Sequence, residues 1–424
     1  MPENKKNRTP ERAGDGRALW LLGVLRGLAG PGLFSSLGVF FPLIAAAGGG
    51  SLGSLSLSVS LASLVGACFL PLAGRWYARY DFRRVTWIGA LMMTVAYALY
   101  AASPNPVWRA LLSLPLGCGM VMLVNLMAPC YLRLRGTDTG SSLGFLVALS
   151  GLVGAAFQPA LARVLAAAGW RITYLLFGAC SLAVMGAAIH LLPSPHRERE
   201  CLCSGTRMPA GTEDAGQGDT RQEDAGAGGG ETPGFTAPGL FFSLFLFQGV
   251  ITGFSMFHQH FSTFAAAAGL PHRTMTAALT LSMLTAAVGA LALGFLTRRF
   301  GVGVTGVGVL VLGGVSVLLF GFVGGGAAGF LAASALHGAA SGAIGVTVPA
   351  AARTLYPKEA YARVLSRVMV SSPLFTLLFM QIYGVTYDRT GGFGASLLLL
   401  LASLVLTAVV WSRMFSRRRE RSRA

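Results

Sequence analysis

Long apolar stretches separated by short polar ones run through the whole of this 424-residue chain. A helix needs about 20 mostly apolar residues to cross the hydrocarbon core of a bilayer, and about twelve stretches reach roughly that length. The pattern therefore predicts an all-α integral membrane protein. The predicted transmembrane spans are 18–46, 53–74, 85–103, 107–132, 140–168, 172–192, 239–266, 274–296, 303–323, 327–351, 362–386 and 393–413.

One polar stretch, 193–238, is much longer than the others and divides the predicted spans into two sets of six. It contains Arg197-Glu198-Arg199-Glu200 and a run of glycines at 228–230. Such a segment has too little apolar surface to fold alone, so it is expected to be a disordered linker. The predicted organisation is an N-terminal tail 1–17, a six-helix bundle 18–192, the linker 193–238, a second six-helix bundle 239–413 and a basic tail 414–424.

The distribution of charged residues predicts how the protein is oriented in the membrane. Only 12% of the residues are charged, against roughly 25% in soluble domains, and the formal net charge is +17. The basic residues lie between apolar runs rather than on one face, which argues against a nucleic-acid partner. With the N-terminus inside, most Lys and Arg fall on cytoplasmic segments, so both termini are expected in the cytoplasm and the protein in the cell (inner) membrane.

The two halves carry a similar pattern after their second span. Gly74, Arg79, Asp81 and Arg83 follow the second span. In the same place after the eighth span stand Gly294, Arg298, Arg299 and Gly301. Duplication of a six-span unit is typical of carriers that rock one half against the other around a site near the middle of the membrane.

These two loops resemble the GxLaDRxG loop motif of the major facilitator superfamily. Gly38-Val-Phe-Phe-Pro42, Gly169-Trp170-Arg171 and the segment from Gly384 to Phe393 make the chain similar to bacterial members of the monocarboxylate transporter family. The resemblance implies the major facilitator fold, secondary active transport, and a gating role for the eight loop residues just named. The acid of the motif is absent, because Ala78 and Arg298 stand in its place.

Polar residues inside the spans are the candidates for chemistry. All 16 acidic residues fall outside the predicted spans, so a carboxylate relay is not expected there. The resemblance implies that spans one, four, seven and ten line a cavity. The predicted substrate-binding residues are Arg26, Asn125, His258, His337 and Arg367, and the candidates for proton coupling are His258, His260 and His337.

Arginine with histidine and without a carboxylate favours an anion. A guanidinium binds a carboxylate in a fork geometry, and a histidine with an ordinary pKa of about 6.5 can carry a proton beside it. Structural roles compete with this interpretation. Arg26 and Arg367 can snorkel to headgroups, Asn125 can satisfy a carbonyl freed by Pro129, and His337 can bridge a tight helix contact. His258 and His260 point about 200° apart on a helix, so at most one faces the cavity.

The expected function is alternating-access transport of a small organic anion, such as a monocarboxylate, with or without a proton. Export of amphipathic compounds is the alternative. A membrane enzyme is disfavoured because His258-Gln259-His260 has no acidic partner nearby in sequence, and a sensor is disfavoured because no signalling domain is visible. Neither a metal site nor a disulfide framework follows from the six cysteines. No cofactor is expected, the lipid bilayer is the only other partner, and no oligomer is required.

Overall fold

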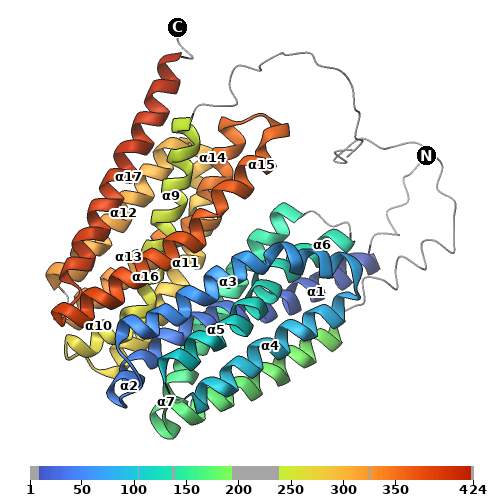
Figure 1. The fold of residues 1–424 in the computed structure, drawn as a ribbon. Helices are drawn as coiled ribbons and strands as arrows, with labels where there is room; N and C mark the ends of the chain where they lie inside the picture. The colour runs from blue at the N-terminus through green and yellow to red at the C-terminus, as the bar shows by residue number, and fades with distance from the viewer. Residues whose placement is uncertain (1–8, 104, 136–138, 193–237, 324–325, 422–424) are drawn as a thin grey trace.

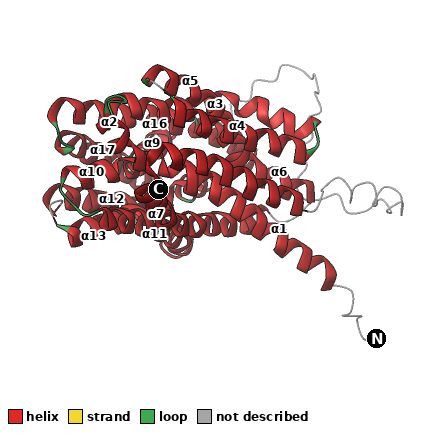
Figure 2. Cartoon of the chain, turned by 90° about the horizontal axis from the view of Figure 1, so that it is seen from below, coloured by secondary structure: helices red, strands yellow, loops and turns green. Residues whose placement is uncertain are grey.

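The structure, a computed structural model, describes residues 9–103, 105–135, 139–192, 238–323 and 326–421. The described chain is helical and contains no strand (Figure 2). The expected linker 193–238 lies outside the described residues except for Pro238, at which a helix begins. The helices are α1 (Thr9–Gly27), η1 (Leu28–Leu33), η2 (Phe34–Phe40), α2 (Phe41–Ala46), α3 (Leu52–Arg79), α4 (Phe82–Ala102), α5 (Pro106–Met120), η3 (Val121–Leu126), α6 (Met127–Arg135), α7 (Thr139–Leu191), α9 (Pro238–Met256), η4 (Phe257–His260), α10 (Phe261–Ala267), α11 (His272–Phe300), α12 (Val302–Val323), α13 (Ala327–Ser341), η5 (Gly342–Gly345), α14 (Thr347–Leu355), α15 (Lys358–Met369), α16 (Ser371–Thr390) and α17 (Gly394–Arg421).

Eleven helical segments within the described residues are long and apolar enough to cross a membrane. One of them, Phe145–Leu191, has 47 residues. As a straight helix it would measure about 70 Å, more than twice the hydrocarbon thickness of a bilayer. Its backbone leaves the helical conformation at Gly169, where φ is 72°, a value that glycine adopts at no steric cost. The segment is therefore two crossings, which brings the total to the twelve that the hydropathy pattern predicts.

Four of the twelve crossings contain a π-helical or 3₁₀-helical segment. The first contains the π-helical η1 and the 3₁₀-helical η2, and the fourth contains the π-helical η3. The seventh and tenth contain the 3₁₀-helical η4 and η5. In η1 the cause is visible, because Pro31 has no N–H to donate and its ring displaces the preceding turn. Interruptions of this kind fall at equivalent places in both halves of the chain.

The crossings form two bundles, α1–α7 and α9–α17 (Figure 1). The bundles converge at the end where α2 and α10 lie, and they separate toward the end where α6 lies on one side and α14 and α15 on the other (Figure 1). We call these the closed end and the open end. Between the bundles, α3 packs on α16, α7 on α11, and η2 on η4.

Gln259 of η4 joins the two bundles at the closed end. Its side-chain oxygen accepts a hydrogen bond from the Gly38 N–H at 2.8 Å, and its amide donates to the Phe34 carbonyl at 3.1 Å. The backbones come so close here that a Cβ on Gly38 would stand 1.7 Å from the Gln259 carbonyl oxygen. Only glycine fits at this position of η2.

A second closed-end contact joins α3 to α16. The Asp388 carboxylate accepts hydrogen bonds from the backbone N–H groups of Leu52 and Gly53, at 2.9 and 2.8 Å. These groups lie in the first turn of α3 and so lack acceptors within their own helix. A Cβ on Gly384 would lie 2.6 Å from the Gly53 Cα, so the two helices also approach through glycine.

Some helix boundaries differ from the predicted spans. The helix expected to begin at residue 18 begins at Thr9, and the one expected to end at 413 continues to Arg421. Hydropathy marks only the part of a helix that lies in lipid, whereas arginine and glutamate extend a helix into water readily. The expected span 362–386 is also two helices, because α15 ends at Met369 and α16 begins at Ser371.

Candidate functional site

A cavity of about 380 Å³ lies between the two bundles where the four interrupted crossings meet. Its volume is within the range of about 300–1,000 Å³ found for small-molecule sites. Transporters often bind their substrates at discontinuous helices near the middle of the membrane. Residues of the interruptions themselves contribute to the wall, together with side chains of α7 and α11: Gly30, Pro31, Phe34, Ser35, Val124, His258, Gly342, Ile344, Gly345, Ser150, Ser282 and Met283.

Arg26, near the end of α1, is the one cationic side chain among the described residues that line this cavity. Its Nε donates to the Val124 carbonyl at 3.1 Å, and its Nη1 donates to Ser150 Oγ at 2.8 Å. A guanidinium has five N–H donors, and no described residue accepts from the others. No Asp or Glu is among the lining residues. The cavity thus presents a held, half-buried cation whose charge has no protein counter-ion in the described structure.

His258 and His337 also line the cavity, with ring centroids 6.5 Å apart. The His258 Nδ1–H donates to the Ser255 carbonyl at 2.5 Å, since a carbonyl oxygen can only accept. Its Nε2 is buried and has no hydrogen-bond partner among the described residues. Neutral His258 therefore offers one vacant acceptor, which a proton or a donor on a solute can occupy.

His337 is held more completely than His258. Its Nε2–H donates to the Phe254 carbonyl at 2.9 Å, and its Nδ1 lies 3.3 Å from Ser282 Oγ. The ring packs 4.5 Å from that of Phe254, centroid to centroid. Both ring nitrogens of His337 thus have hydrogen-bond partners in this conformation. His337 is a fixed part of the cavity wall and has no nitrogen left to bind a solute.

His260 does not reach the cavity. Its side chain is fully buried at the closed end, among the rings of Tyr383 at 5.4 Å, Phe393 at 5.7 Å and Phe41 at 5.9 Å. Neither ring nitrogen has a hydrogen-bond partner among the described residues. Of the two histidines that flank Gln259, only His258 faces the cavity.

Two predicted site residues lie elsewhere. Asn125 is exposed within η3, whereas its neighbour Val124 is buried against the cavity. Adjacent residues on a helix point roughly 100° apart, and η3 turns Val124 rather than Asn125 toward the cavity. Arg367 is exposed on α15, which forms the first part of the candidate crossing Arg363–Thr390. Neither residue is among those that line the cavity.

The two predicted gating loops lie at the open end. After α3, which ends at Arg79, Asp81 caps α4 by accepting from the Arg84 N–H at 3.3 Å, and Arg83 donates to the Leu192 carbonyl at 2.5 Å. In the second bundle, Gly294, Arg298 and Arg299 belong to α11 itself. That helix ends at Gly301, whose φ of 80° permits the sharp exit. Gly74 and Gly294 each have open space where a Cβ would stand. The gating role of the eight residues stays a prediction.

Sequence reasoning missed several parts of the site. Ser150, which holds Arg26, is one of several serines on the mainly apolar α7 and gives no signal of its own. The methionines Met120, Met256 and Met283 in the wall resemble ordinary core residues in the sequence. The interruption at η1 did have a signal, because Gly30-Pro31-Gly32 is a poor helix former in the middle of a predicted span.

No protein-family model matches the sequence, and no curated protein matches it either. Solved structures do match. A mutant of the nucleoside transporter NupG superposes with a TM-score of 0.70 at 13% identity, covering 94% of this chain and 99% of the other. A bacterial homolog of the human lysosomal transporter Spinster, described as inward-facing and occupied, gives 0.68 at 15%, covering 97% and 98%.

A POT family transporter in complex with a thioalcohol-conjugated peptide gives a TM-score of 0.67 at 10% identity, covering 96% of each chain. At such low identities the likeness is one of fold. The match extends over nearly the whole of each partner, so the expected major facilitator fold is confirmed.

Proposed function

We propose that this protein is a secondary transporter that moves a small organic anion, such as a monocarboxylate, across a membrane by alternating access. The fold it shares with the transporters named above supports the general activity. The nucleoside and peptide transporters among them handle other solutes, so the proposed substrate class rests on this chain's own cavity.

One observation carries the substrate class: Arg26 faces the cavity with N–H donors that no described protein group accepts. A buried charge is costly unless it is paired. Water can satisfy the guanidinium while the cavity is open, but a carboxylate does so bidentately and neutralises the charge. Because Val124 and Ser150 fix the plane of the guanidinium, part of the ordering cost of binding is already met.

His258 is the proposed proton carrier. Its vacant Nε2 lies in the same cavity as Arg26, and protonation there would add a second cation beside a bound anion. In this scheme His337 serves as a fixed part of the wall. His260 has a packing role at the closed end, where its ring lies between aromatic side chains of both bundles.

The direction of access follows from charge. The open end carries the basic loops and the ends of α1 and α17, so under the positive-inside rule it faces the cytoplasm. In the described conformation the bundles meet at the closed end, and the cavity is then an inward-facing one. Expulsion or uptake requires the contacts of Gln259 and Asp388 to break and the open end to close.

The alternative is transport of an amphipathic compound. Met120, Met256 and Met283 give the cavity a pliable apolar wall that suits varied shapes. A substrate of this kind needs an apolar body and can dispense with the pairing to Arg26. The two functions therefore differ in how they respond to removal of that charge.

Uptake of labelled monocarboxylates into proteoliposomes, with and without an inward proton gradient, tests the proposal. Arg26→Gln should lower uptake at least about tenfold, because hydrogen bonds to charged groups contribute about 1.5–3 kcal/mol. Arg26→Lys should retain part of it, since lysine keeps the charge but loses the fork. His258→Gln should remove stimulation by the proton gradient and leave anion exchange.

Matched controls are available on the same helices or of the same residue type. Arg17→Gln changes an exposed arginine of α1, and His190→Gln an exposed histidine at the end of α7; both should behave as the unchanged protein. Full uptake by Arg26→Gln would refute the anion site. Absence of uptake for every anion, together with extrusion of cationic dyes, would establish the amphipathic alternative instead.

A further inference from the structure

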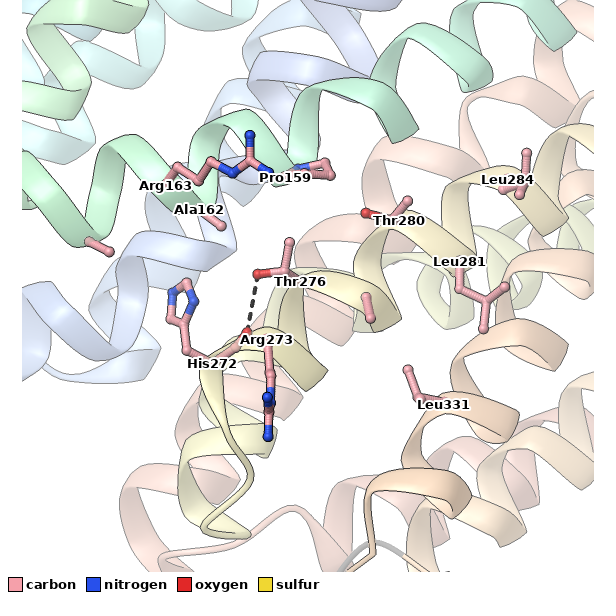
Figure 3. Close-up of a pocket in the computed structure, with 12 residues that line it drawn as sticks. Pro159, Ala162, Arg163, His272, Arg273, Thr276, Thr280, Leu281, Leu284 and Leu331 are labelled. Atoms are coloured by element: carbon pink, nitrogen blue, oxygen red, sulfur yellow. Dashed lines mark hydrogen bonds between the residues drawn. The ribbon is translucent and has the colours of Figure 1, made fainter.

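A groove of about 720 Å³ follows the seam between α7 and α11 on the side of the closed end, apart from the central cavity (Figure 3). Each of these helices belongs to a different bundle, and α13 flanks the groove. We call it the seam groove. Arg163, His272 and Arg273 lie at one end of it, with the two arginine side chains pointing apart, and leucines line the other end (Figure 3). We propose that the seam groove binds an anionic phospholipid, with the phosphate at Arg163, His272 and Arg273 and an acyl chain over Leu281, Leu284 and Leu331.

The two arginines of the groove have no protein counter-ion in the described part of the chain. No hydrogen bond or ion pair joins the guanidinium of Arg163 or Arg273 to another residue in the described part of the chain. Arg163 lies six residues before the turn at Gly169, about 9 Å along the helix. It therefore sits on a lipid-facing surface below the end of the crossing. An arginine at such depth is stable when it reaches a phosphate.

The length of the groove matches one leaflet. His272 begins α11, and Leu284 follows twelve residues later, about 18 Å along the helix. Half of a bilayer's hydrocarbon core is about 15 Å thick. The groove has basic residues at the end of the crossing and leucines toward the middle of the membrane. It therefore has the polarity and the length of one lipid molecule.

Two threonines of α11 also form part of the groove wall. Thr280 lines it, and its hydroxyl is buried without a hydrogen-bond partner among the described residues. The neighbouring Thr276 hydroxyl is already used, since it donates to the His272 carbonyl at 3.1 Å (Figure 3). The proposed lipid therefore depends on neither hydroxyl, and its binding rests on the basic residues and the leucines of the groove.

Such a lipid would touch both bundles at once. Near the middle of the membrane α7 and α11 are in close contact, because a Cβ on Gly151 would stand 3.1 Å from the Ala287 Cβ. Toward the closed end they frame the groove. A ligand that bridges the two helices in this arrangement stabilises the closed end relative to any conformation that moves them apart.

Native mass spectrometry of the full chain in detergent tests the site. Phosphatidylglycerol and phosphatidylcholine with identical chains are added at equal concentration, and the bound fraction of each is measured. Phosphatidylglycerol should be retained preferentially, and Arg163→Gln/Arg273→Gln should lower its retention at least about tenfold. Arg171→Gln/Arg389→Gln removes two exposed charges at the same end but outside the groove, and should leave retention unchanged.

A second variant obstructs the groove without changing charge. Ala166→Trp places a large ring in the groove at an exposed position, so the chain should fold normally while phosphatidylglycerol retention falls. A photoactivatable acyl chain should crosslink to α11 between Thr276 and Leu284. Equal retention of the two lipids, unchanged retention in the double Gln variant or in Ala166→Trp, or an equal loss in the control pair would each overturn the proposal.

Discussion

The contact between Asp388 and the start of α3 should control how often the closed end opens. Asp388 belongs to the second bundle and α3 to the first, so this hydrogen-bonded cap exists only while the bundles touch. Replacing Asp388 with alanine removes both acceptors and the negative charge at a helix N-terminus. The fold of each bundle should survive, because α3 keeps its own cap through Ser51, whose side chain accepts from the Ser54 N–H at 3.3 Å.

The size of the effect can be estimated from the geometry. A carboxylate near a helix N-terminus contributes about 0.3–1 kcal/mol when exposed, and a capping side chain contributes about 0.5–2 kcal/mol. These ranges describe overlapping effects, and Asp388 is exposed, so their sum is an upper limit. We expect Asp388→Ala to favour opening by about 1–2 kcal/mol, which changes the open-to-closed ratio roughly 5–30-fold. Asp388→Asn, which keeps one acceptor oxygen, should give a smaller change.

Distances between spin labels would measure this ratio. Ala47 and Ala267 are exposed at the closed end, one beside α2 and the other at the end of α10. Cysteines at these two positions, in a chain whose six native cysteines are replaced, carry the labels in liposomes. Asp388→Ala should increase the population with the longer distance by the factor given above.

A matched control separates opening from general weakening of α3. Ser51→Ala removes the cap that lies within the first bundle, so it should lower the stability of the chain and leave the two distance populations alone. The reasoning fails if Asp388→Ala leaves the ratio within a factor of two of the unchanged protein. It also fails if Ser51→Ala shifts the ratio as much.

Two further substitutions test the closed end. Gly38→Ala should make the longer distance dominant between the same labels, because the added Cβ would stand 1.7 Å from the Gln259 carbonyl oxygen. Gly321→Ala in α12, where nothing lies within 4 Å, should have no effect. Arg109→Gln should lower the free energy of unfolding in detergent by about 2–3 kcal/mol, because the buried Arg109 guanidinium donates to the Gly49 carbonyl in the loop before α3. An unchanged melting curve would contradict the second expectation.

Hydropathy was sufficient to predict the number and order of the crossings, because crossing length is a local property of the sequence. It could not predict where helices continue into water, as α1 does from Thr9 and α17 does to Arg421. Nor could it separate α15 from α16, since the apolar stretch runs on through the joint; the local signal there is Pro373 in the first turn of α16, which hydropathy does not register. Helix ends depend on capping and packing as well as on apolar length.

The site was predictable in its residue types and only partly in its geometry. Arg26, His258 and His337 stand out because charged and titratable residues are rare inside spans. Which way each one points depends on the phase of its helix, and η1 to η5 change that phase at the cavity. Asn125 shows the result, since it is exposed while Val124 lines the wall. The serine that orients Arg26 carried no signal because it comes from a distant part of the chain.

The contacts at the closed end determine how the bundles separate. Gln259, Ser262 and Asp388 of the second bundle all reach backbone groups of the first. When the seam opens, water can take over these hydrogen bonds, so each contributes only about 0.5–1.5 kcal/mol net, or somewhat more for the carboxylate. Glycines at 38 and 53 let the backbones approach closely without interlocked side chains. The seam combines such bonds with buried aromatic contacts, such as that of Phe41 with His260. Opening it therefore exchanges the hydrogen bonds for bonds to water and also exposes these rings, so both terms set how firmly the closed end closes.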